Sequence, residues 1–239
     1  VVADDGRVDV FGKIAGIARS QHVPDVTEQD WDQMVAVNLS GVFWCAQAAI
    51  PHLLKVDGVL INIASNAGLM GQAYTVPYCA TKGAVVNMTR ALAMEYAKTG
   101  LRVNAIAPGA VQTPLVDNYQ LPEEIDFSLM AGYIGLREMS RPEDIAAFFA
   151  FLASDEARQV HGAILSVDAG LTAAVLRAAS PTTSAASARI VRVVAARSTL
   201  LGQLAQGRGQ RRVQPVANVT APLGSLQAAL RPQLAAVGA

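Results

Sequence analysis

The sequence has few of the residues on which metal sites and disulfide-bonded folds depend. Its 239 residues include two cysteines and three histidines, and no group of His, Cys, Asp and Glu shows the spacing of a metal site. Two cysteines are too few for a disulfide framework, so Cys45 and Cys79 are expected to be free thiols in a reducing cytoplasm. Neither a bound metal nor a disulfide scaffold is predicted.

Long apolar runs and a charge excess are also missing. We find no signal peptide and no apolar run long enough to span a bilayer, which predicts a cytoplasmic protein with no membrane partner. The net charge is zero, but residues 1–173 hold all 19 acidic residues against 11 basic ones, a net charge of −8. An acidic body argues against nucleic-acid binding, so a small molecule is the expected ligand.

The C-terminal part lacks still more residue types. Residues 174–239 contain no Lys, Asp, Glu, Met, Cys or aromatic residue, and their only charges are eight arginines. This composition predicts an Ala/Arg-rich extension that is disordered or translated out of frame. The alternative is a basic amphipathic segment at residues 188–206 that contacts acidic partners or a membrane surface. A boundary between residues 173 and 174 therefore separates the body from this extension.

What the body does contain is an α/β pattern centred on residues 58–95. Val59–Ile63 is an apolar run of strand length, Ala64–Gly68 is a loop of small and polar residues, and Gly83–Glu95 has a helical pattern. Ligands in parallel α/β sheets bind at the carboxyl ends of the strands, which is where this loop lies. Residues 64–68 are therefore the first place to look for a functional site.

The alternation of strands and helices continues on both sides of this centre. Further strands are predicted at residues 8–11, 101–107 and 162–167, and further helices at about 28–54 and 143–157. Thr27 is expected to cap the first helix, and Ser140-x-x-Glu143 to form a capping box before the second. The apolar face of the second helix is predicted to consist of Ile145, Phe148, Phe149 and Leu152. Such alternation implies an α/β fold with a parallel sheet and right-handed crossovers.

Tyr78 and Lys82 give the first indication of chemistry. Residues four apart share a helix face, so the lysine ammonium would lie beside the phenol. A nearby positive charge lowers the pKa of tyrosine from about 10 toward a range useful for proton transfer. Ser65, at the end of the preceding strand, would offer its hydroxyl to a substrate carbonyl. Tyr-x-x-x-Lys alone is more often a surface pair, but the strand, the Ser65 loop and the helix together favour a catalytic set.

These residues resemble the catalytic signature of the short-chain dehydrogenase/reductase family, in Asn-Ile-Ala-Ser65 and Tyr78-Cys-Ala-Thr-Lys82. Asn38, in Val-Asn-Leu-Ser-Gly, resembles the fourth active-site residue of that family. Residues 108–114 resemble the segment that holds the nicotinamide end of the cofactor, and residues 166–171 the final strand and turn. The resemblance covers about residues 6–173.

The resemblance implies a doubly wound, Rossmann-like fold and hydride transfer between NAD or NADP and an alcohol or ketone. Tyr78 would be the general acid/base, Lys82 would lower its pKa and bind the nicotinamide ribose, Ser65 would hold the substrate oxygen, and Asn38 would support a proton relay. The implied cofactor-binding residues are Ala15, Gly16, Tyr78, Lys82, Pro108, Gly109, Val111 and Thr113. Without the resemblance, Asn38 reads equally as a satisfied core amide and Thr113 as a helix cap. The family also implies a homo-oligomer, a dimer or tetramer assembled through residues 28–54 and 79–98.

The N-terminal part departs from the family pattern. Where the family has Asn-Asn-Ala-Gly at the end of a strand, this chain has Lys13-Ile14-Ala15-Gly16. No glycine-rich turn that would hold a pyrophosphate precedes this strand. The resemblance therefore implies a chain truncated at its N-terminus, with residues 8–11 left as an open sheet edge.

Other functions remain open on the sequence alone. The chain could be an inactive fragment, or a non-catalytic subunit that pairs with an intact partner. A nucleotide-sugar epimerase or dehydratase shares Tyr-x-x-x-Lys but needs a further domain after Gly170, and a third alternative is an interaction protein that uses the basic extension. Residues 115–139 are expected to form a mobile lid that sets specificity, with apolar packing by Tyr119, Phe127, Met130 and Tyr133.

Overall fold

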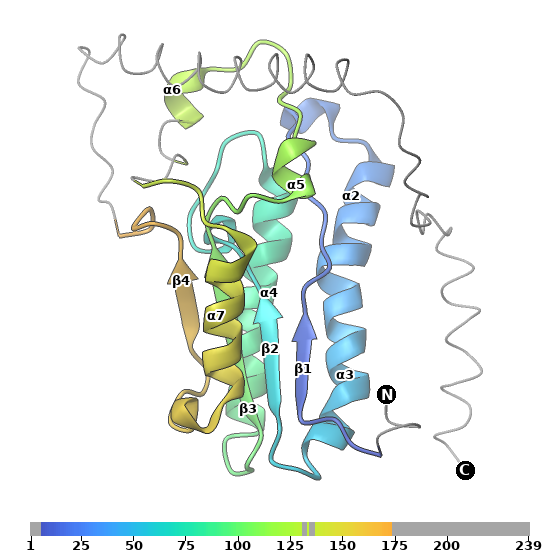
Figure 1. Cartoon of the computed structure of the whole chain (residues 1–239). Helices are drawn as coiled ribbons and strands as arrows, with labels where there is room; N and C mark the ends of the chain where they lie inside the picture. Colours follow the sequence, from blue (N-terminus) through green and yellow to red (C-terminus); the bar gives the residue numbers. More distant parts are fainter. Residues whose placement is uncertain (1–5, 131–132, 134–136, 174–239) are drawn as a thin grey trace, which may run out of the picture. The chain divides into compact units, whose positions relative to one another are not determined.

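The computed structural model describes residues 6–130, 133 and 137–173. The predictions for residues 174–239 lie outside the described residues. The body contains one parallel sheet of four strands, which stand in the sheet in the order of the sequence (Figure 1). The strands are β1 (Val10–Lys13), β2 (Val59–Ile63), β3 (Arg102–Pro108) and β4 (Ile164–Val167). The predicted Rossmann-like fold with a parallel sheet is confirmed.

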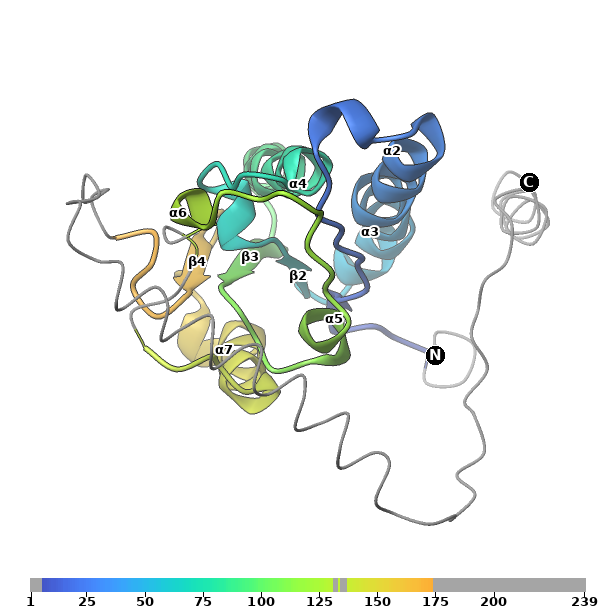
Figure 2. The same cartoon turned by 90° about the horizontal axis from the view of Figure 1, so that it is seen from above.

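Helices cover both faces of this sheet (Figure 2). One face packs against α3 (Gly41–Leu53) and α4 (Val76–Glu95), and the other against α7 (Pro142–Ala153). Because successive residues of a strand point to opposite faces, Leu60 of β2 joins the cluster with α3 while Ile61 joins the cluster with α7. Both side chains are fully buried. A strand that is apolar on both faces, such as β2, is what a sheet covered on both sides requires.

The helix predicted at about residues 28–54 is one helical stretch with a widened turn inside it. It begins as α2 (Glu28–Val35), where the Thr27 hydroxyl accepts a hydrogen bond from Asp30 N–H at 3.1 Å, as the capping pattern predicted. Residues Ala36–Ser40 form a π-helical turn, after which α3 continues to Leu53. Such widened turns are frequent at functional sites.

The stretch Glu28–Leu53 is also long and apolar enough to cross a membrane, judged by length and composition alone. This differs from the expectation that the chain has no such run. The same residues supply part of the packed interior of the body, because Met34, Val42, Ala46 and Leu53 are all buried. A core helix of a globular fold meets the same criterion.

Shorter elements complete the part of the chain that the structure describes. Above the carboxyl ends of the strands lie α5 (Pro114–Asp117) and α6 (Phe127–Met130) (Figure 1). Three short 3-10 helices lie at Val23–Asp25, Asn66–Gly68 and Asp155–Ala157. The segments that the sequence analysis described as a lid are thus on the side of the sheet where ligands bind in this class of fold.

Several boundaries differ from those predicted. Helix α4 begins at Val76, well before Gly83, and strands β3 and β4 begin one and two residues later than expected. Strand β1 begins at Val10, not at residue 8, and it is an edge of the described sheet, as expected for the first strand. Helix α7 begins at Pro142, and its N-terminal cap is Arg141, whose backbone N–H donates to the Asp144 carboxylate at 2.7 Å. The capping box predicted at Ser140 and Glu143 is therefore one residue too early. The helix ends at Ala153, and Phe148 is 42 % exposed and so does not belong to its buried face.

Candidate active site

Ser65 lies where β2 ends, at the start of the Asn66–Gly68 turn. Its backbone is extended, and its hydroxyl oxygen accepts a hydrogen bond from Ala67 N–H at 3.1 Å while donating to Asn66 Oδ1 at 3.2 Å. The turn lies directly on α4: a methyl group added to Gly68 would be 2.6 Å from the Lys82 carbonyl oxygen. Only a glycine allows the backbone of the turn to pack this closely against α4, and this close contact fixes the position of Ser65 relative to α4.

Helix α4 brings Tyr78 and Lys82 to one side of that turn. They are one helical turn apart, and Lys82 Nζ lies 5.7 Å from the centre of the Tyr78 ring. Lys82 is 5 % exposed. Its ammonium donates at 2.9 Å to the carbonyl of Ile63, which is the last residue of β2. The strand that positions Ser65 therefore also anchors Lys82.

Burial dominates the electrostatics of this pair. It raises the pKa of Tyr78 above its ordinary value, and the nearby Ser65 hydroxyl only partly opposes this effect. Burial, together with the charge of Lys13, lowers the pKa of Lys82 to about 8. The sequence suggested that Lys82 lowers the pKa of Tyr78. In the chain without ligands, removal of the phenol from water has the larger effect and the opposite sign.

Asn38 is fully buried in the π-helical turn and is bonded on both sides of its amide. Its Oδ1 accepts from Ile17 N–H at 2.9 Å, and its Nδ2 donates to the Ile17 carbonyl at 2.7 Å. The amide is thus a satisfied core group, one of the two interpretations that the sequence left open. It also lies beside the site, since a methyl group on Gly16 would be 3.3 Å from Asn38 Oδ1 and 3.7 Å from Lys82 Nζ.

The expected cofactor-binding residues lie at the carboxyl ends of β1 and β3. Gly16 borders Lys82 and Asn38, as described, and Ala15 precedes it on the exposed segment after β1. Pro108 ends β3, and a methyl group on Gly109 would be 2.9 Å from Asp168 Cα, so this turn is tight against the residue after β4. Val111 bridges to Ser140, and Thr113 starts α5 without a side-chain cap.

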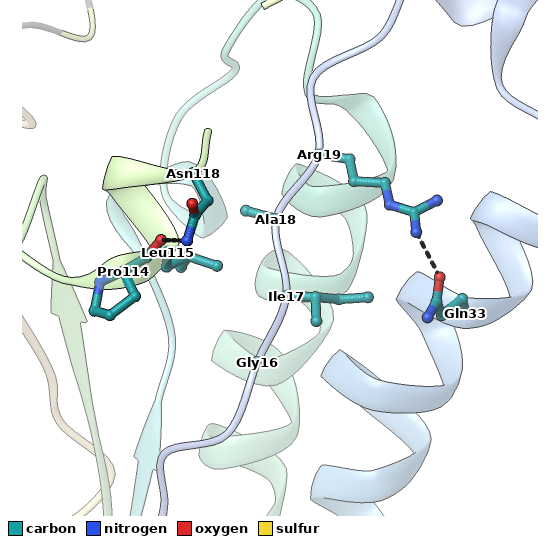
Figure 3. A pocket seen from close by; sticks show the side chains of 8 residues that line it. All are labelled: Gly16, Ile17, Ala18, Arg19, Gln33, Pro114, Leu115 and Asn118. Atoms are coloured by element: carbon teal, nitrogen blue, oxygen red, sulfur yellow. Dashed lines mark hydrogen bonds between the residues drawn. The ribbon is translucent and has the colours of Figure 1, made fainter. Parts of the chain in front are cut away.

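A hollow of about 430 Å³ opens beside Gly16 (Figure 3). The segment Gly16–Arg19 runs between α5 and α2, with the Ala18 side chain toward α5 and the Ile17 side chain toward α2. The lining residues are Gly16, Ile17, Ala18, Arg19, Gln33, Pro114, Leu115 and Asn118. The Arg19 guanidinium is held at the rim by Gln33 Oε1, at 2.7 Å, and by Asp30. This hollow adjoins the face on which Lys82 and Asn38 meet.

Comparison with known proteins decides the family. A family model described as enoyl-(acyl carrier protein) reductase matches residues 1–172. The chain is 40 % identical over 168 residues to meso-2,3-butanediol dehydrogenase of Serratia marcescens, covering 70 % of this chain and 66 % of the relative. It is 38 % identical over 172 residues to a 3-oxoacyl-[acyl-carrier-protein] reductase of Thermotoga maritima, covering 72 % and 69 %. The chain belongs to the short-chain dehydrogenase/reductase family.

Solved structures of the family agree with this assignment. A 3-ketoacyl-(acyl-carrier-protein) reductase from Brucella melitensis complexed with NADH superposes with a TM-score of 0.65 at 32 % identity, covering 72 % of this chain and 70 % of that one. A short-chain dehydrogenase from Mycobacterium paratuberculosis bound to NAD gives 0.66 at 32 %, covering 72 % and 67 %. The chain thus spans about two thirds of the length of the relatives that it matches.

The structure adds residues to this short-chain dehydrogenase site that sequence reasoning missed. Burial raises the pKa of Tyr119, and the charge of Tyr119 in turn raises the pKa of Tyr78. Burial also raises the pKa of Tyr133 to about 12, with Tyr119 contributing. The sequence analysis had assigned both tyrosines to apolar lid packing. No local pattern distinguishes a phenol that faces the site from one that packs in a lid.

A second missed feature is a connection between the lid and the segment before α2. His22 Nε2 lies 2.9 Å from the Glu123 carbonyl oxygen, and the Tyr74 hydroxyl accepts from Asp126 N–H at 2.8 Å. The rings of His22 and Tyr74 meet edge to face with centres 5.1 Å apart. The three segments are far apart in the sequence, so no motif indicates the connection.

Proposed function

We propose that the chain is an oxidoreductase that transfers a hydride between NAD or NADP and an alcohol or ketone. The observation that carries the proposal is the convergence of Ser65, Tyr78 and Lys82 at the end of β2, held there by the Gly68 contact and the bond from Lys82 to Ile63. Family membership supports the same reaction class.

Each side chain has a distinct task in this proposal. Tyr78 takes the hydroxyl proton when an alcohol is oxidised and returns it when a ketone is reduced. Ser65 holds the substrate oxygen, for which its hydroxyl must turn away from Asn66. While Lys82 is protonated, its positive charge stabilises the phenolate form of Tyr78. Asn38 holds the backbone of Ile17 beside Lys82.

The described residues fit the nicotinamide and ribose half of such a cofactor. Gly16 leaves open the space that a methyl group would fill beside Lys82 and Asn38, and Lys82 uses only one of its three donor hydrogens on Ile63. Gly109 and Thr113 follow β3 on the same side of the sheet. When bound, the nicotinamide ring accepts or supplies the hydride. Within residues 6–130, 133 and 137–173 we find no glycine-rich turn that suits a pyrophosphate.

A second candidate is an inactive chain or a subunit that pairs with an intact partner. It is supported by Lys13 and Ile14, which replace the two amides of the family pattern. We also propose assembly as a dimer or tetramer in the cytoplasm. Exposed apolar side chains on the predicted contact helices support assembly: Trp44 on α3 is 56 % exposed and Met94 on α4 is 77 % exposed.

The relatives differ in substrate: they include a dehydrogenase of a diol and reductases of oxoacyl groups on acyl carrier protein. The hollow beside Gly16 is lined by apolar side chains of Ile17, Ala18 and Leu115 with Arg19 at its rim. We propose a secondary alcohol or ketone of small size as the substrate class.

Titration of the purified chain with NADH and NADPH, followed by nucleotide fluorescence, is the first test. Saturable binding, and turnover of small secondary alcohols that falls about 10²-fold or more in Tyr78→Phe, is the expected result. Tyr96→Phe, at the residue that follows α4 and outside the site, is the matched control. A folded chain that binds neither nucleotide at millimolar concentration would overturn the oxidoreductase proposal and support the inactive chain.

A further inference from the structure

The chain contains four lysines, at positions 13, 55, 82 and 98. Lys55 and Lys98 are exposed, whereas Lys82 is buried in the candidate active site and Lys13 is partly buried at the end of β1. The function proposed above uses Lys82 and leaves Lys13 without a task.

Lys13 points to the same face of the sheet as the active site. A methyl group on Gly12 would collide with the Phe149 ring of α7, so the neighbouring residue, Lys13, projects to the opposite face. On that face, Lys13 Nζ would be 3.5 Å from a methyl group added to Gly41. Gly41 directly follows the π-helical turn that carries Asn38. In the sheet, Lys13 is the register partner of Asn62, next to Ile63.

No negative charge compensates Lys13 or Lys82 in the described structure. The three ion pairs recorded among described residues involve only arginines and aspartates. Asn62 Oδ1 is buried and has no hydrogen-bond donor, so even this register partner does not take up the Lys13 ammonium. Two ammonium groups on one face of a sheet edge repel each other more strongly than in water, because the medium between them is less polarisable.

The elements packed on α4 confirm that no carboxylate faces Lys82. Strand β2, the π-helical turn and the Asn66–Gly68 turn contain no charged side chain. On α4 itself, Tyr78 and Cys79 precede Lys82 by one turn, and Arg90 and Glu95 lie further along the helix. On β3, Arg102 lies at the opposite end of the strand, bound to the carbonyl of Leu152.

The remaining packed element, α2, has three acidic residues. Asp30 is paired with Arg19, and Glu28 and Asp32 are exposed at the outer surface. Burial and the charge of Lys13 together hold the pKa of Lys82 at about 8. Among these groups, Lys13 is the one whose charge changes the protonation of Lys82.

We propose that Lys13 is a positioning residue of the active site that acts through Lys82: its ammonium, on the same face of the sheet edge and one residue from the Ile63 carbonyl that holds Lys82, adds to the effect of burial and lowers the upper pH limit at which Lys82 assists Tyr78. Below that pH, Lys82 is charged and favours the phenolate of Tyr78. Above it, Lys82 is neutral and this assistance is lost, which disfavours oxidation of an alcohol first, because that direction requires the phenolate.

The catalytic meaning of this inference rests on the proposed function, but its test needs neither cofactor nor turnover. The full chain is labelled with ¹³C-lysine, and each lysine is titrated by nuclear magnetic resonance. The four resonances are assigned by single Lys→Arg variants, and Lys55 and Lys98 serve as internal references. Failure of nucleotide binding and failure of this inference are thus separate results.

Lys13→Met removes the charge and keeps the aliphatic stem, whereas Lys13→Arg keeps the charge. We expect Lys13→Met to raise the pKa of Lys82 by on the order of half a pH unit, and Lys13→Arg to leave it as in the native chain. An unchanged pKa of Lys82 in a folded Lys13→Met variant overturns the inference, since burial alone would then account for the value.

A second measurement decides the matter if Lys13→Met does not fold. The native chain is titrated at 0.05 M and 0.5 M sodium chloride. Screening of a repulsion between two ammonium groups raises the pKa of Lys82 at the higher salt concentration, whereas an effect of burial alone leaves it unchanged or lower. Once a substrate is known, the pH profile of kcat is expected to shift upward in Lys13→Met and not in Lys13→Arg.

Discussion

Asn38 closes on Ile17 through both halves of its amide, accepting from the Ile17 N–H at 2.9 Å and donating to the Ile17 carbonyl at 2.7 Å. The Asn38 side-chain amide thus makes the two hydrogen bonds to Ile17 that the backbone of a neighbouring β-strand would make. It fixes the loop after β1 against the π-helical turn and thereby sets the width of the space beside Gly16.

Asn38→Leu is expected to destabilise the chain by about 1–3 kcal/mol, because it leaves both partly buried backbone groups of Ile17 without their present partner. Urea denaturation followed by circular dichroism measures the change. Asn118→Leu is the matched control: Asn118 is exposed and its amide donates to one carbonyl on its own helix, so we expect a change below about 0.5 kcal/mol. Equal losses in the two variants would contradict the role of Asn38.

Lys82 makes the stability of the fold depend on pH in a defined window. Its pKa is about 8 in the folded chain and 10.5 in the unfolded chain, so between these values the unfolded state binds more protons. Stability contributed by this group therefore rises with pH from about 8 to about 10.5. Below pH 8, folding bears the full cost of burying the charge, about 3 kcal/mol.

Lys82→Met is accordingly expected to stabilise the chain at pH 7 by about 1–2 kcal/mol, because the lost bond to Ile63 offsets part of the relieved burial. Denaturation at pH 7, 8 and 9 should show the native chain approaching the variant as pH rises. Measurements stay below pH 9.5, since burial of Tyr78 favours its neutral form and removes stability at higher pH. A difference between native and variant that does not change with pH would contradict the assignment.

The Tyr74 hydroxyl holds an exposed loop within the segment predicted to be a lid, by accepting from Asp126 N–H at 2.8 Å. We expect Tyr74→Phe to speed hydrogen exchange of the Asp126 amide about 5- to 10-fold, the effect of losing a bond worth about 1 kcal/mol. His22→Ala should loosen the same loop through Glu123. Tyr96→Phe is the control, and exchange at Asp126 that is identical in Tyr74→Phe and Tyr96→Phe would show that the lid does not depend on this bond.

Arg102 joins the start of β3 to the chain reversal after α7. Its guanidinium donates to the carbonyls of Leu152, Ser154 and Ala157 at 2.7, 3.0 and 3.1 Å. Lysine cannot reach three acceptors in this fork, so Arg102→Lys should cost about 1–3 kcal/mol in unfolding free energy. Arg158→Lys, at an exposed position on the same reversal, should cost less than about 0.5 kcal/mol. Urea melts of the two variants that coincide would refute this role.

Local patterns predicted much of this fold. The apolar run Val59–Ile63 is β2 with the predicted boundaries, and the Thr27 cap is where its spacing indicated. Ser65, Tyr78 and Lys82 meet because a strand, a turn and a helix follow each other within 24 residues, so local structure alone brings them together. Periodicity could not show the π-helical turn at Asn38, because one widened turn hardly disturbs a helical pattern over the whole stretch.

Contacts between distant segments left no trace in the sequence. His22 and Glu123 are 101 positions apart, and the hollow beside Gly16 needs Leu115 and Asn118 from a segment almost as far away. The pKa direction of Tyr78 was also beyond a sequence argument, because it depends on how completely the surrounding side chains remove water from the phenol. Charge alone suggested a lowering, and desolvation reverses it.

The four strands stand side by side in the order in which they occur in the chain. A chain emerging from the ribosome can therefore add each strand and its helix to a finished neighbour, without holding a gap open for a later insertion. Each strand is joined to the next through a crossover that contains one or more helices, so strands that are neighbours in the sheet are also consecutive in the chain. Helix α4, which carries Tyr78 and Lys82, lies between β2 and β3 in the chain, so the proposed catalytic residues can be in place before β4 has been synthesised. The order of the strands in the sheet thus allows this site to form during synthesis, from its N-terminal segments to its C-terminal ones.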